Sequence, residues 1–522
     1  MGAVPVSPVN PVTEESRTDP SDRLATLTSW DAEWAGLRVV VTGLGLSGFS
    51  AADTLAELGA HVVVVDGQDS LEHRAKADTL KIVGVQDVLL GDRHTAVLPD
   101  VGGLAPELVV TSPGWRPDQP VLAAAAAADI PIWGDVELAW RVRERAGRKT
   151  ADWLVVTGTN GKTTTVGMVE SMLLAAGQRA IACGNVGTPI LDAIRDPEGW
   201  DTIAVELSSF QLHWTHHIEP AASAVLNLAE DHVDWHGSFE AYCADKAKIY
   251  EHTRLACLFN EEQPLTMRMV EEADVQDGCR AISFTTDTPG RSMLGVVDGL
   301  LVDRAFLADR ATRALELGQL QDLGRIAPQH QVANALAAAG LVRAIGVPPE
   351  AVRDGLRAYR PGEHRIQLVA QADDVLWIND SKATNPHAAD ASLAAFTDVV
   401  WIAGGLPKGV SYDELVTRHV GRLRAVVLIG ADPGELAGAL RRHAPDIPVL
   451  STAVRDTGTD PSDGHQAMAA AVREANAVAR PGDVVLMAPA AASMDQFESY
   501  ADRGNAFIDA VARLMEAKGL GS

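Results

Sequence analysis

A short glycine-bounded loop, about a third of the way along the chain, ends in a lysine and two threonines. The loop reads Gly158-Thr159-Asn160-Gly161-Lys162-Thr163-Thr164. Such a loop is typical of phosphate binding, because its backbone N–H groups and the following helix N-terminus face an anion. Lys162 would reach the terminal phosphates of a nucleotide, and the Thr163 hydroxyl would hold Mg²⁺. The standard pattern has its first glycine at the position of Val156, so a structural turn with a solvated lysine is the alternative.

The residues around this loop predict the elements that position it. The apolar run 153–156 predicts a buried strand, and the apolar spacing over 166–174 predicts a helix. A strand, a glycine loop and a helix in this order favour nucleotide binding over a chance match.

A second glycine loop stands nearer the N-terminus, Gly43-Leu44-Gly45-Leu46-Ser47-Gly48. It lies between a predicted strand, 38–42, and a predicted helix, 49–58, and the next strand ends at Asp66. This pattern is the dinucleotide fingerprint, and alone it favours an NAD- or FAD-dependent enzyme. Ser112-Pro113-Gly114 follows another predicted strand, at the sheet edge where ligands bind.

Three further residues stand just after predicted strands of the central block. Glu206 ends an apolar strand, where a buried carboxylate needs a partner such as Mg²⁺, although it could instead cap a helix. His232 lies in an acidic loop after the strand 222–227, and Lys246 follows on a helix. A free ammonium cannot ligate a metal, so the residues alone leave the role of Lys246 open.

Three predicted strand ends in the last third of the chain carry lysine or hydroxyl side chains. The strands are 375–379, 399–403 and 483–487. The side chains that follow them are Lys382, Thr384, Lys408 and Ser493. Together they indicate a receptor for a small anion such as a carboxylate, although each lysine alone could be a solvated loop residue.

The composition excludes several classes of protein. A net charge of −26 over 522 residues argues against nucleic acid as a partner. The four cysteines have no CxxC spacing and are expected to be reduced thiols. No apolar run is long enough for a membrane span, and no signal pattern opens the chain.

Alternating strands and helices predict an α/β protein of three domains. We expect a disordered tail over 1–34, rich in Pro, Ser, Thr and acids, and a Rossmann-like domain over 35–131. A central P-loop ATPase-type parallel-sheet domain would span 132–361, and a Rossmann-like C-terminal domain 362–522. Asp298-Gly299 between two apolar runs predicts a hairpin in the central domain.

Together the motifs resemble the D-glutamate-adding branch of the Mur ligase family. The segments that carry the resemblance are 158–164, 206–212, 230–234, 380–385, 492–497 and 503–505. The resemblance covers about residues 37–515, and the stretch 281–325 is enlarged. It implies a cytoplasmic, monomeric ligase that uses ATP and Mg²⁺ to add D-glutamate to UDP-N-acetylmuramoyl-L-alanine in peptidoglycan precursor synthesis.

The resemblance also implies roles for individual residues. Lys162, Glu206, His232 and Lys246 would be catalytic, with Lys246 carbamylated and binding metal beside Thr163, Glu206 and His232. The expected ATP contacts are Gly158, Thr159, Asn160, Gly161, Lys162, Thr163, Thr164, Asn334, Arg365 and Asp380. The expected contacts of the uridine substrate are Gly45, Leu46, Ser47, Asp66, Ser112, Gly114 and Asn185. Those of D-glutamate are Lys382, Thr384, Lys408, Ser493 and Tyr500.

Four residues, at three places in the chain, depart from the family pattern. Gly67-Gln68 replaces Thr-Arg after the acid, Gln331 replaces an asparagine, and Tyr500 replaces a phenylalanine. The alternatives are another Mur-type or folylpolyglutamate-type ligase, an NAD-dependent oxidoreductase, and a nucleotide-binding regulatory protein without catalysis.

Overall fold

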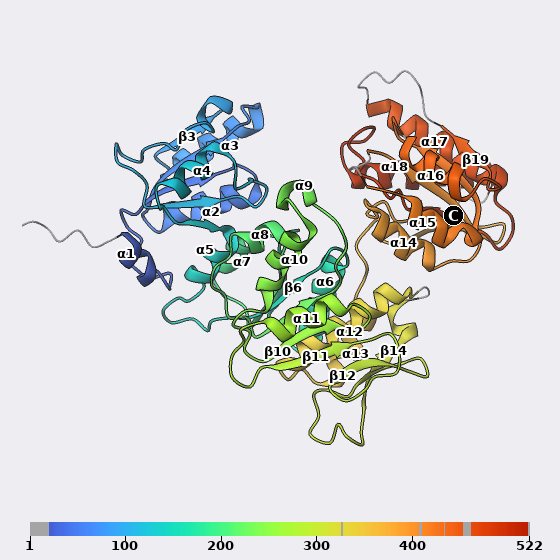
Figure 1. Cartoon of the computed structure of the whole chain (residues 1–522), viewed down its shortest axis with the longest axis horizontal. Helices are drawn as coiled ribbons and strands as arrows, with labels where there is room; N and C mark the ends of the chain where they lie inside the picture. Colours follow the sequence, from blue (N-terminus) through green and yellow to red (C-terminus); the bar gives the residue numbers. More distant parts are fainter. Residues whose placement is uncertain (1–19, 325–326, 407–409, 433, 453–460, 520–522) are drawn as a thin grey trace, which may run out of the picture. The chain divides into compact units, whose positions relative to one another are not determined.

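The computed structural model describes residues 20–324, 327–406, 410–432, 434–452 and 461–519 (Figure 1). It divides into two units. Unit 1 contains residues 1–151, 188–201 and 210–218. Unit 2 contains residues 152–187, 202–209 and 219–522.

Unit 1 is built on a parallel sheet with the strand order β3-β2-β1-β4-β5. Helices cover both faces of a parallel sheet, so its inner strands are buried. This burial accounts for the valine runs of β1 and β2. The strands are β1 (Arg38–Thr42), β2 (His61–Asp66), β3 (Asp87–Leu90), β4 (Leu108–Thr111) and β5 (Ile132–Gly134). The helices are α1 (Pro20–Thr26), α2 (Leu46–Glu57), α3 (Leu71–Ile82), α4 (Pro120–Ala127), α5 (Asp135–Val142) and α7 (Ile190–Arg195).

The structure differs from two of the predicted boundaries in this region. The strand β5 pairs with β4, so the first sheet extends past the predicted boundary at residue 131. The predicted tail is ordered from residue 20 onward, where α1 begins, and residues 1–19 lie outside the described residues. The reason is that Leu24, Leu27 and Trp34 are buried, which offsets the entropy of ordering a polar segment.

Unit 2 contains a central sheet of nine strands in the order β14-β13-β12-β11-β10-β9-β6-β8-β7. Its strands are β6 (Asp152–Thr157), β7 (Ala180–Gly184), β8 (Thr202–Glu206), β9 (Ala222–Val225), β10 (Ala256–Asn260), β11 (Arg280–Phe284), β12 (Met293–Val297), β13 (Leu300–Asp303) and β14 (Leu315–Gln319). The helices around it are α6 (Lys162–Ala175), α9 (Val233–His236), α10 (Phe239–Ala247), α11 (Pro264–Glu272), α12 (Gln329–Ala344) and α13 (Pro349–Ala358). The short helix α8 (Ser209–His213) belongs to unit 1 from residue 210 onward.

The enlarged stretch 281–325 extends this central sheet. Its strands β12, β13 and β14 pair antiparallel, which makes the sheet mixed at that end. The predicted hairpin is confirmed: β12 and β13 are joined at Asp298 and Gly299, which both have positive φ. Two positive φ values in succession give the turn twist that matches a two-residue hairpin.

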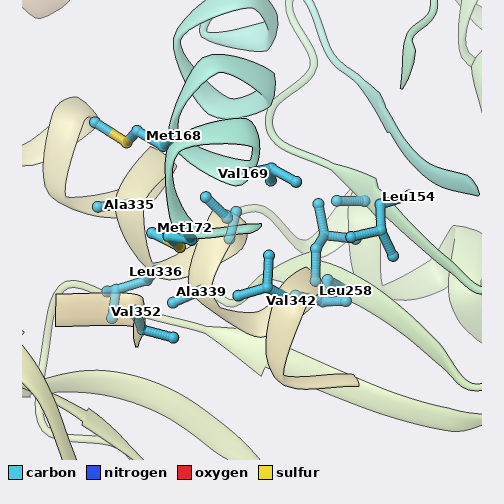
Figure 2. Packing of buried hydrophobic residues seen from close by; sticks show 14 of the residues in the cluster. Leu154, Met168, Val169, Met172, Leu258, Ala335, Leu336, Ala339, Val342 and Val352 are labelled. Carbon is cyan, nitrogen blue, oxygen red and sulfur yellow. The ribbon is translucent and has the colours of Figure 1, made fainter. Parts of the chain in front are cut away.

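The helix after the glycine loop, α6, is held by two helices from much later in the chain. Figure 2 shows Met168, Val169 and Met172 of α6 in one apolar cluster with Ala335, Leu336 and Ala339 of α12 and Val352 of α13. All of these side chains are buried. The packing fixes the N-terminus of α6, where Lys162 begins the helix.

Replacing Gly355 with alanine should destabilise this packing. A Cβ at Gly355 would lie 2.4 Å from the Met172 Cα, and the Ser171 hydroxyl donates a hydrogen bond of 2.7 Å to the Gly355 carbonyl. Because a backbone atom cannot easily yield, we expect a loss of about 1–3 kcal/mol and a lower midpoint in thermal unfolding. Gly421→Ala is the control, since a Cβ there meets nothing within 4 Å. Equal midpoints for the two variants would contradict the expectation.

The second sheet of unit 2 has the order β15-β16-β20-β17-β18-β19, with β15 antiparallel. Its strands are β15 (Gln367–Ala372), β16 (Val375–Asn379), β17 (Val399–Gly404), β18 (Leu423–Ile429), β19 (Val449–Ser451) and β20 (Val484–Met487). Its helices are α14 (Pro386–Ala394), α15 (Asp413–His419), α16 (Gly434–His443), α17 (Pro461–Val478) and α18 (Tyr500–Ala517). Apolar clusters cover both faces. Among the described residues, no helix is both long and apolar enough to cross a membrane.

Candidate active site

The predicted strand, loop and helix are present at the phosphate loop, which we define as residues 158–164. The loop joins β6 to α6, and Gly161 caps the helix with a φ of 87°. Asn227 holds the loop from the next strand's end: the Asn160 N–H donates to its Oδ1 (2.8 Å), and its Nδ2 donates to the Asn160 carbonyl (3.0 Å). The loop is therefore shaped before any ligand arrives, with a helix N-terminus available to an anion.

Lys162 is folded onto the loop. Its Nζ donates to the carbonyls of Gly158 and Thr159, each at 2.9 Å. Burial lowers the pKa of this ammonium, whereas the nearby carboxylates of Glu206 and Asp231 act to raise it. A phosphate would offer the ammonium a stronger, charged acceptor than these carbonyls.

Glu206 presents an unsatisfied carboxylate oxygen beside the loop. It ends β8, which pairs with β6, and it is 2% exposed. Its Oε1 accepts a hydrogen bond of 2.9 Å from Asn185 Nδ2, while its Oε2 is buried and has no hydrogen-bond partner among the described residues. A buried carboxylate oxygen of this kind fits a cation, and Thr163 lines the same cavity.

His232 stands in the loop after β9. Its backbone is left-handed, with a φ of 55°, and caps α9. Its Nε2 lies 3.6 Å from the Asp231 carboxylate, and 37% of its side chain is exposed. The imidazole is thus accessible on the same sheet edge as Glu206.

Lys246 lies beneath the phosphate loop. Its side chain is buried, and its Nζ donates to the Thr157 hydroxyl (3.1 Å) and to the Gly158 carbonyl (3.0 Å). Burial, and then the charge of Lys162, hold its pKa well below the usual range for lysine. Burial at this position therefore favours the neutral amine over the ammonium.

The helix α12 meets the phosphate loop at its glycine. A Cβ at Gly161 would lie 2.5 Å from Asn334 Oδ1, so only glycine fits beside this side chain. Asn334 is buried, and His330 and Gln331 of the same helix line the cavity. Burial lowers the pKa of His330 to about 4, so that imidazole is neutral at physiological pH.

The loop after β16 carries Asp380, Lys382 and Thr384. Asp380 accepts hydrogen bonds from the Ser392 hydroxyl and the Ile366 N–H, and burial raises its pKa to about 6. The Lys382 ammonium lies 3.8 Å from the ring centroid of Tyr500, and burial lowers its pKa to about 8. A cation that lies over an aromatic ring and has no ion pair with a carboxylate among the described residues is suited to an anionic ligand.

A cavity of about 840 Å³ in unit 2 brings most of the predicted residues of this unit together. The predicted residues that line it are Thr159, Asn160, Gly161, Lys162, Thr163, Thr164, Asn185, Glu206, His232, Asn334, Arg365, Asp380, Lys382 and Thr384. Gly158, Lys246, Ser493 and Tyr500 are not among its lining residues. Lys408 lies outside the described residues.

The glycine loop of unit 1, residues 43–48, is tightly built. A Cβ at Gly48 would lie 1.9 Å from the Gly43 carbonyl oxygen, so α2 packs against the loop only with glycine there. Gly45 has open space and Leu46 is 69% exposed, so this end of the loop is accessible. Gly43 packs against Ser112, whose hydroxyl is buried without a hydrogen-bond partner among the described residues.

Asp66 is engaged by the backbone around that loop. Its Oδ2 accepts from the Leu44 N–H (2.6 Å) and its Oδ1 from the Gln68 N–H (2.7 Å). These bonds fix the loop's shape and orient the carboxylate. Whether Asp66 also contacts a ligand, as the sequence predicts, stays a prediction, as does the role of Ser47 and Gly114.

Sequence reasoning missed two residues that shape the site. Asn227 clamps the phosphate loop, and the Tyr242 hydroxyl lies 2.8 Å from that of Thr159. The polar Asn227 at the end of an apolar strand was the available signal, whereas Tyr242 on a helix gave none.

Three family models match this chain. Residues 37–134 match the model described as "Mur ligase MurD-like, N-terminal domain". Residues 156–342 match "Mur ligase middle domain", and residues 364–491 match "Mur ligase, glutamate ligase domain". Together these segments cover most of the chain.

Curated proteins align over nearly the full length. The UDP-N-acetylmuramoylalanine–D-glutamate ligase of Leifsonia xyli subsp. xyli is 53% identical over 506 residues, covering 95% of this chain and 96% of that protein. The ligase of the same name from Streptomyces avermitilis is 55% identical over 481 residues, covering 92% and 99%. Among solved structures, UDP-N-acetylmuramate–alanine ligase from Thermotoga maritima superposes with a TM-score of 0.52 at 18% identity, covering 92% of this chain and 100% of that one. That likeness shows a shared fold.

Proposed function

This chain belongs to the Mur ligase family, and from that membership we propose that it joins D-glutamate to UDP-N-acetylmuramoyl-L-alanine at the expense of ATP, in peptidoglycan precursor synthesis. The relatives that carry this activity in their names align with 92% or more of the chain. We also infer that the enzyme acts in the cytoplasm, where ATP and nucleotide-linked precursors are made, and as a monomer.

The observation that carries the proposal is that Lys162 and the unsatisfied carboxylate of Glu206 line the same cavity at one sheet edge. The phosphate loop supplies backbone N–H groups and an ammonium for the phosphates of ATP. Glu206 Oε2 and the Thr163 hydroxyl are oxygen ligands suited to Mg²⁺, which would neutralise charge on the transferring phosphoryl group. Asn334 would meet the adenine, Asp380 the ribose and Arg365 the phosphates.

The proposed reaction has two steps. The alanyl carboxylate attacks the γ-phosphorus of ATP, the bond to the bridging oxygen breaks, and ADP leaves behind an acyl phosphate. The amine of D-glutamate then attacks the acyl carbon, and the tetrahedral intermediate expels phosphate as the amide forms. Lys162 and the loop N–H groups stabilise the charge that develops during phosphoryl transfer.

We further propose that Lys246 becomes carbamylated. Only a neutral amine adds CO₂, and the buried Lys246 has a pKa well below the usual range. The product would be an anion, and with His232 it would hold a second Mg²⁺, which removes the difficulty that an ammonium cannot be a metal ligand.

The two substrates are assigned to different loops. The accessible end of the glycine loop, Gly45 to Ser47, would receive the diphosphate of the uridine substrate, with Asp66, Ser112, Gly114 and Asn185 as further contacts. D-Glutamate would bind at Lys382, Thr384, Ser493 and Tyr500, with Lys408 as a second cation. Two carboxylates on the incoming amino acid match two lysines and two hydroxyls.

The direct test is phosphate release with ATP and UDP-N-acetylmuramoyl-L-alanine, with and without D-glutamate. We expect sustained release only when D-glutamate is present, and formation of the amide by mass spectrometry. L-Glutamate, D-alanine and L-lysine serve as competing amino acids. Sustained turnover with one of these, and none with D-glutamate, would assign the enzyme to another branch of the family.

The affinity for D-glutamate should fall as the pH rises through 8. Lys382 has a pKa of about 8, so its ammonium is charged below that pH and loses its charge above it. If one cationic contact is lost, the KM for D-glutamate should rise by about tenfold between pH 7 and pH 9. In Lys382→Arg the guanidinium stays charged, so the rise should be smaller than in wild type. A steep rise in that variant too would assign the pH dependence to another group.

A further inference from the structure

Arg503 is a buried cation in the middle of the proposed amino-acid site. It lies on α18 and is 1% exposed. Its guanidinium donates to the Ser381 carbonyl (2.9 Å), the Ser381 hydroxyl (3.0 Å) and the Ala491 carbonyl (3.1 Å). Ser381 follows β16 and Ala491 follows β20, so one side chain joins the loops of two neighbouring strands.

The loop after β17 meets the same guanidinium. A Cβ at Gly405 would lie 3.2 Å from Arg503 Nη1 and 2.2 Å from the Ala492 carbonyl oxygen, so Gly405 packs against both. The Leu406 N–H donates to that Ala492 carbonyl at 2.9 Å. Three loops therefore converge on Arg503. The first carries Lys382 and Thr384, the second carries Ser493, and the third is described here by Gly405 and Leu406.

The charge of Arg503 is poorly compensated. Within the described ranges no carboxylate lies at ion-pair distance from it, and Asp495 is the acid whose charge favours its protonated form. Burial lowers its pKa to about 9, which still leaves it protonated at neutral pH. A buried charge without a counter-charge is costly, and a nearby anionic ligand reduces that cost.

We propose that Arg503 is a positioning residue that holds the three loops in their binding geometry, and that its buried charge selects an amino acid with a second carboxylate. The proposal rests on the proposed function, since it assigns the amino-acid site to these loops. Arg503 contacts the loops through carbonyl and hydroxyl oxygens. It would therefore act on the substrate indirectly, by fixing the loops and by the electrostatic attraction of its positive charge. It therefore explains selectivity for an acidic amino acid beyond the direct lysine contacts.

The test compares Arg503→Met and Arg503→Lys with wild type, using D-glutamate and its neutral analogue D-glutamine. In Arg503→Met the KM for D-glutamate should rise about 10- to 100-fold, while those for ATP and the uridine substrate change less than about threefold. The ratio of kcat/KM for D-glutamate over D-glutamine should fall at least about tenfold, because D-glutamine lacks the second carboxylate that the Arg503 charge would attract. Arg503→Lys should retain most of this ratio while still raising both KM values, because it keeps the charge and loses the fork of hydrogen bonds.

Arg424→Met is the matched control. Arg424 lies on β18 of the same sheet but is paired with Asp483, with Nη2 and Oδ1 3.1 Å apart, so its removal should leave every KM near wild type. If Arg503→Met raises both amino-acid KM values equally, or leaves them unchanged, the proposal is overturned. If Arg503→Met does not fold, Arg503→Lys provides the test. A large fall in its ratio of kcat/KM for D-glutamate over D-glutamine would then overturn the proposed role of the charge. A wild-type enzyme that does not use D-glutamate would refute the proposed function instead.

Discussion

Replacing Lys162 with alanine should reduce phosphate release by on the order of 10²-fold or more. The ammonium would stabilise negative charge on the transferring phosphoryl group, and losing one such contact in a preorganised site has an effect of this size. The fold should survive, because Lys162 Nζ contacts only loop carbonyls in the described structure, those of Gly158 and Thr159. Single-turnover formation of ADP, measured beside circular dichroism, checks both parts.

Lys149→Ala controls for the loss of a lysine as such. Its side chain is 69% exposed and pairs with Asp201, so turnover should be unchanged. A folded Lys162→Ala enzyme with turnover close to that of Lys149→Ala would show that Lys162 is not in the phosphoryl-transfer machinery.

Replacing Lys246 with alanine should leave the enzyme nearly inactive, again by on the order of 10²-fold or more, because the proposed second metal loses an anionic ligand. The buried space left by the side chain offers a site for a small carboxylic acid to replace the carbamate. Partial recovery of activity with added formate or acetate is therefore expected. In wild type, ¹³C-labelled bicarbonate should give a carbamate signal in NMR that is absent from the variant.

Lys248→Ala is the matched control for Lys246. It lies two residues further on, is partly exposed, and pairs with Asp245 at 2.9 Å. We expect it to keep its activity and to show no response to short carboxylic acids. The carbamate hypothesis fails if wild type is fully active in bicarbonate buffer while Lys246 remains a free amine.

Central strands could be predicted closely from the sequence, because their apolar runs are buried. The strands β1 (Arg38–Thr42) and β16 (Val375–Asn379) were predicted with the observed bounds. Edge strands were harder to predict from the sequence. In β15 (Gln367–Ala372) most residues are only partly buried, so the sequence there mixes polar and apolar residues without a clear period.

The candidate site was predictable where it follows strands, since the carboxyl ends of parallel strands meet at one edge. Glu206, His232 and Lys382 were found in this way and line one cavity. Long-range contacts were not predictable. Arg503 touches Ser381 across 122 positions of the chain, and no local pattern encodes that contact.

The helices α12 and α13 come much later in the sequence than α6, which has a consequence for synthesis on the ribosome. The phosphate loop and α6 are complete at Ala175, but the helices that cover the apolar side of α6 span Gln329–Ala344 and Pro349–Ala358. At roughly 5–20 residues per second, this delay leaves Met168 and Met172 uncovered for on the order of 10–30 s. The nascent central domain is therefore a natural client for a chaperone during that interval. A polypeptide released before residue 358 would contain every residue of the phosphate loop and still lack part of the packing that fixes the N-terminus of α6.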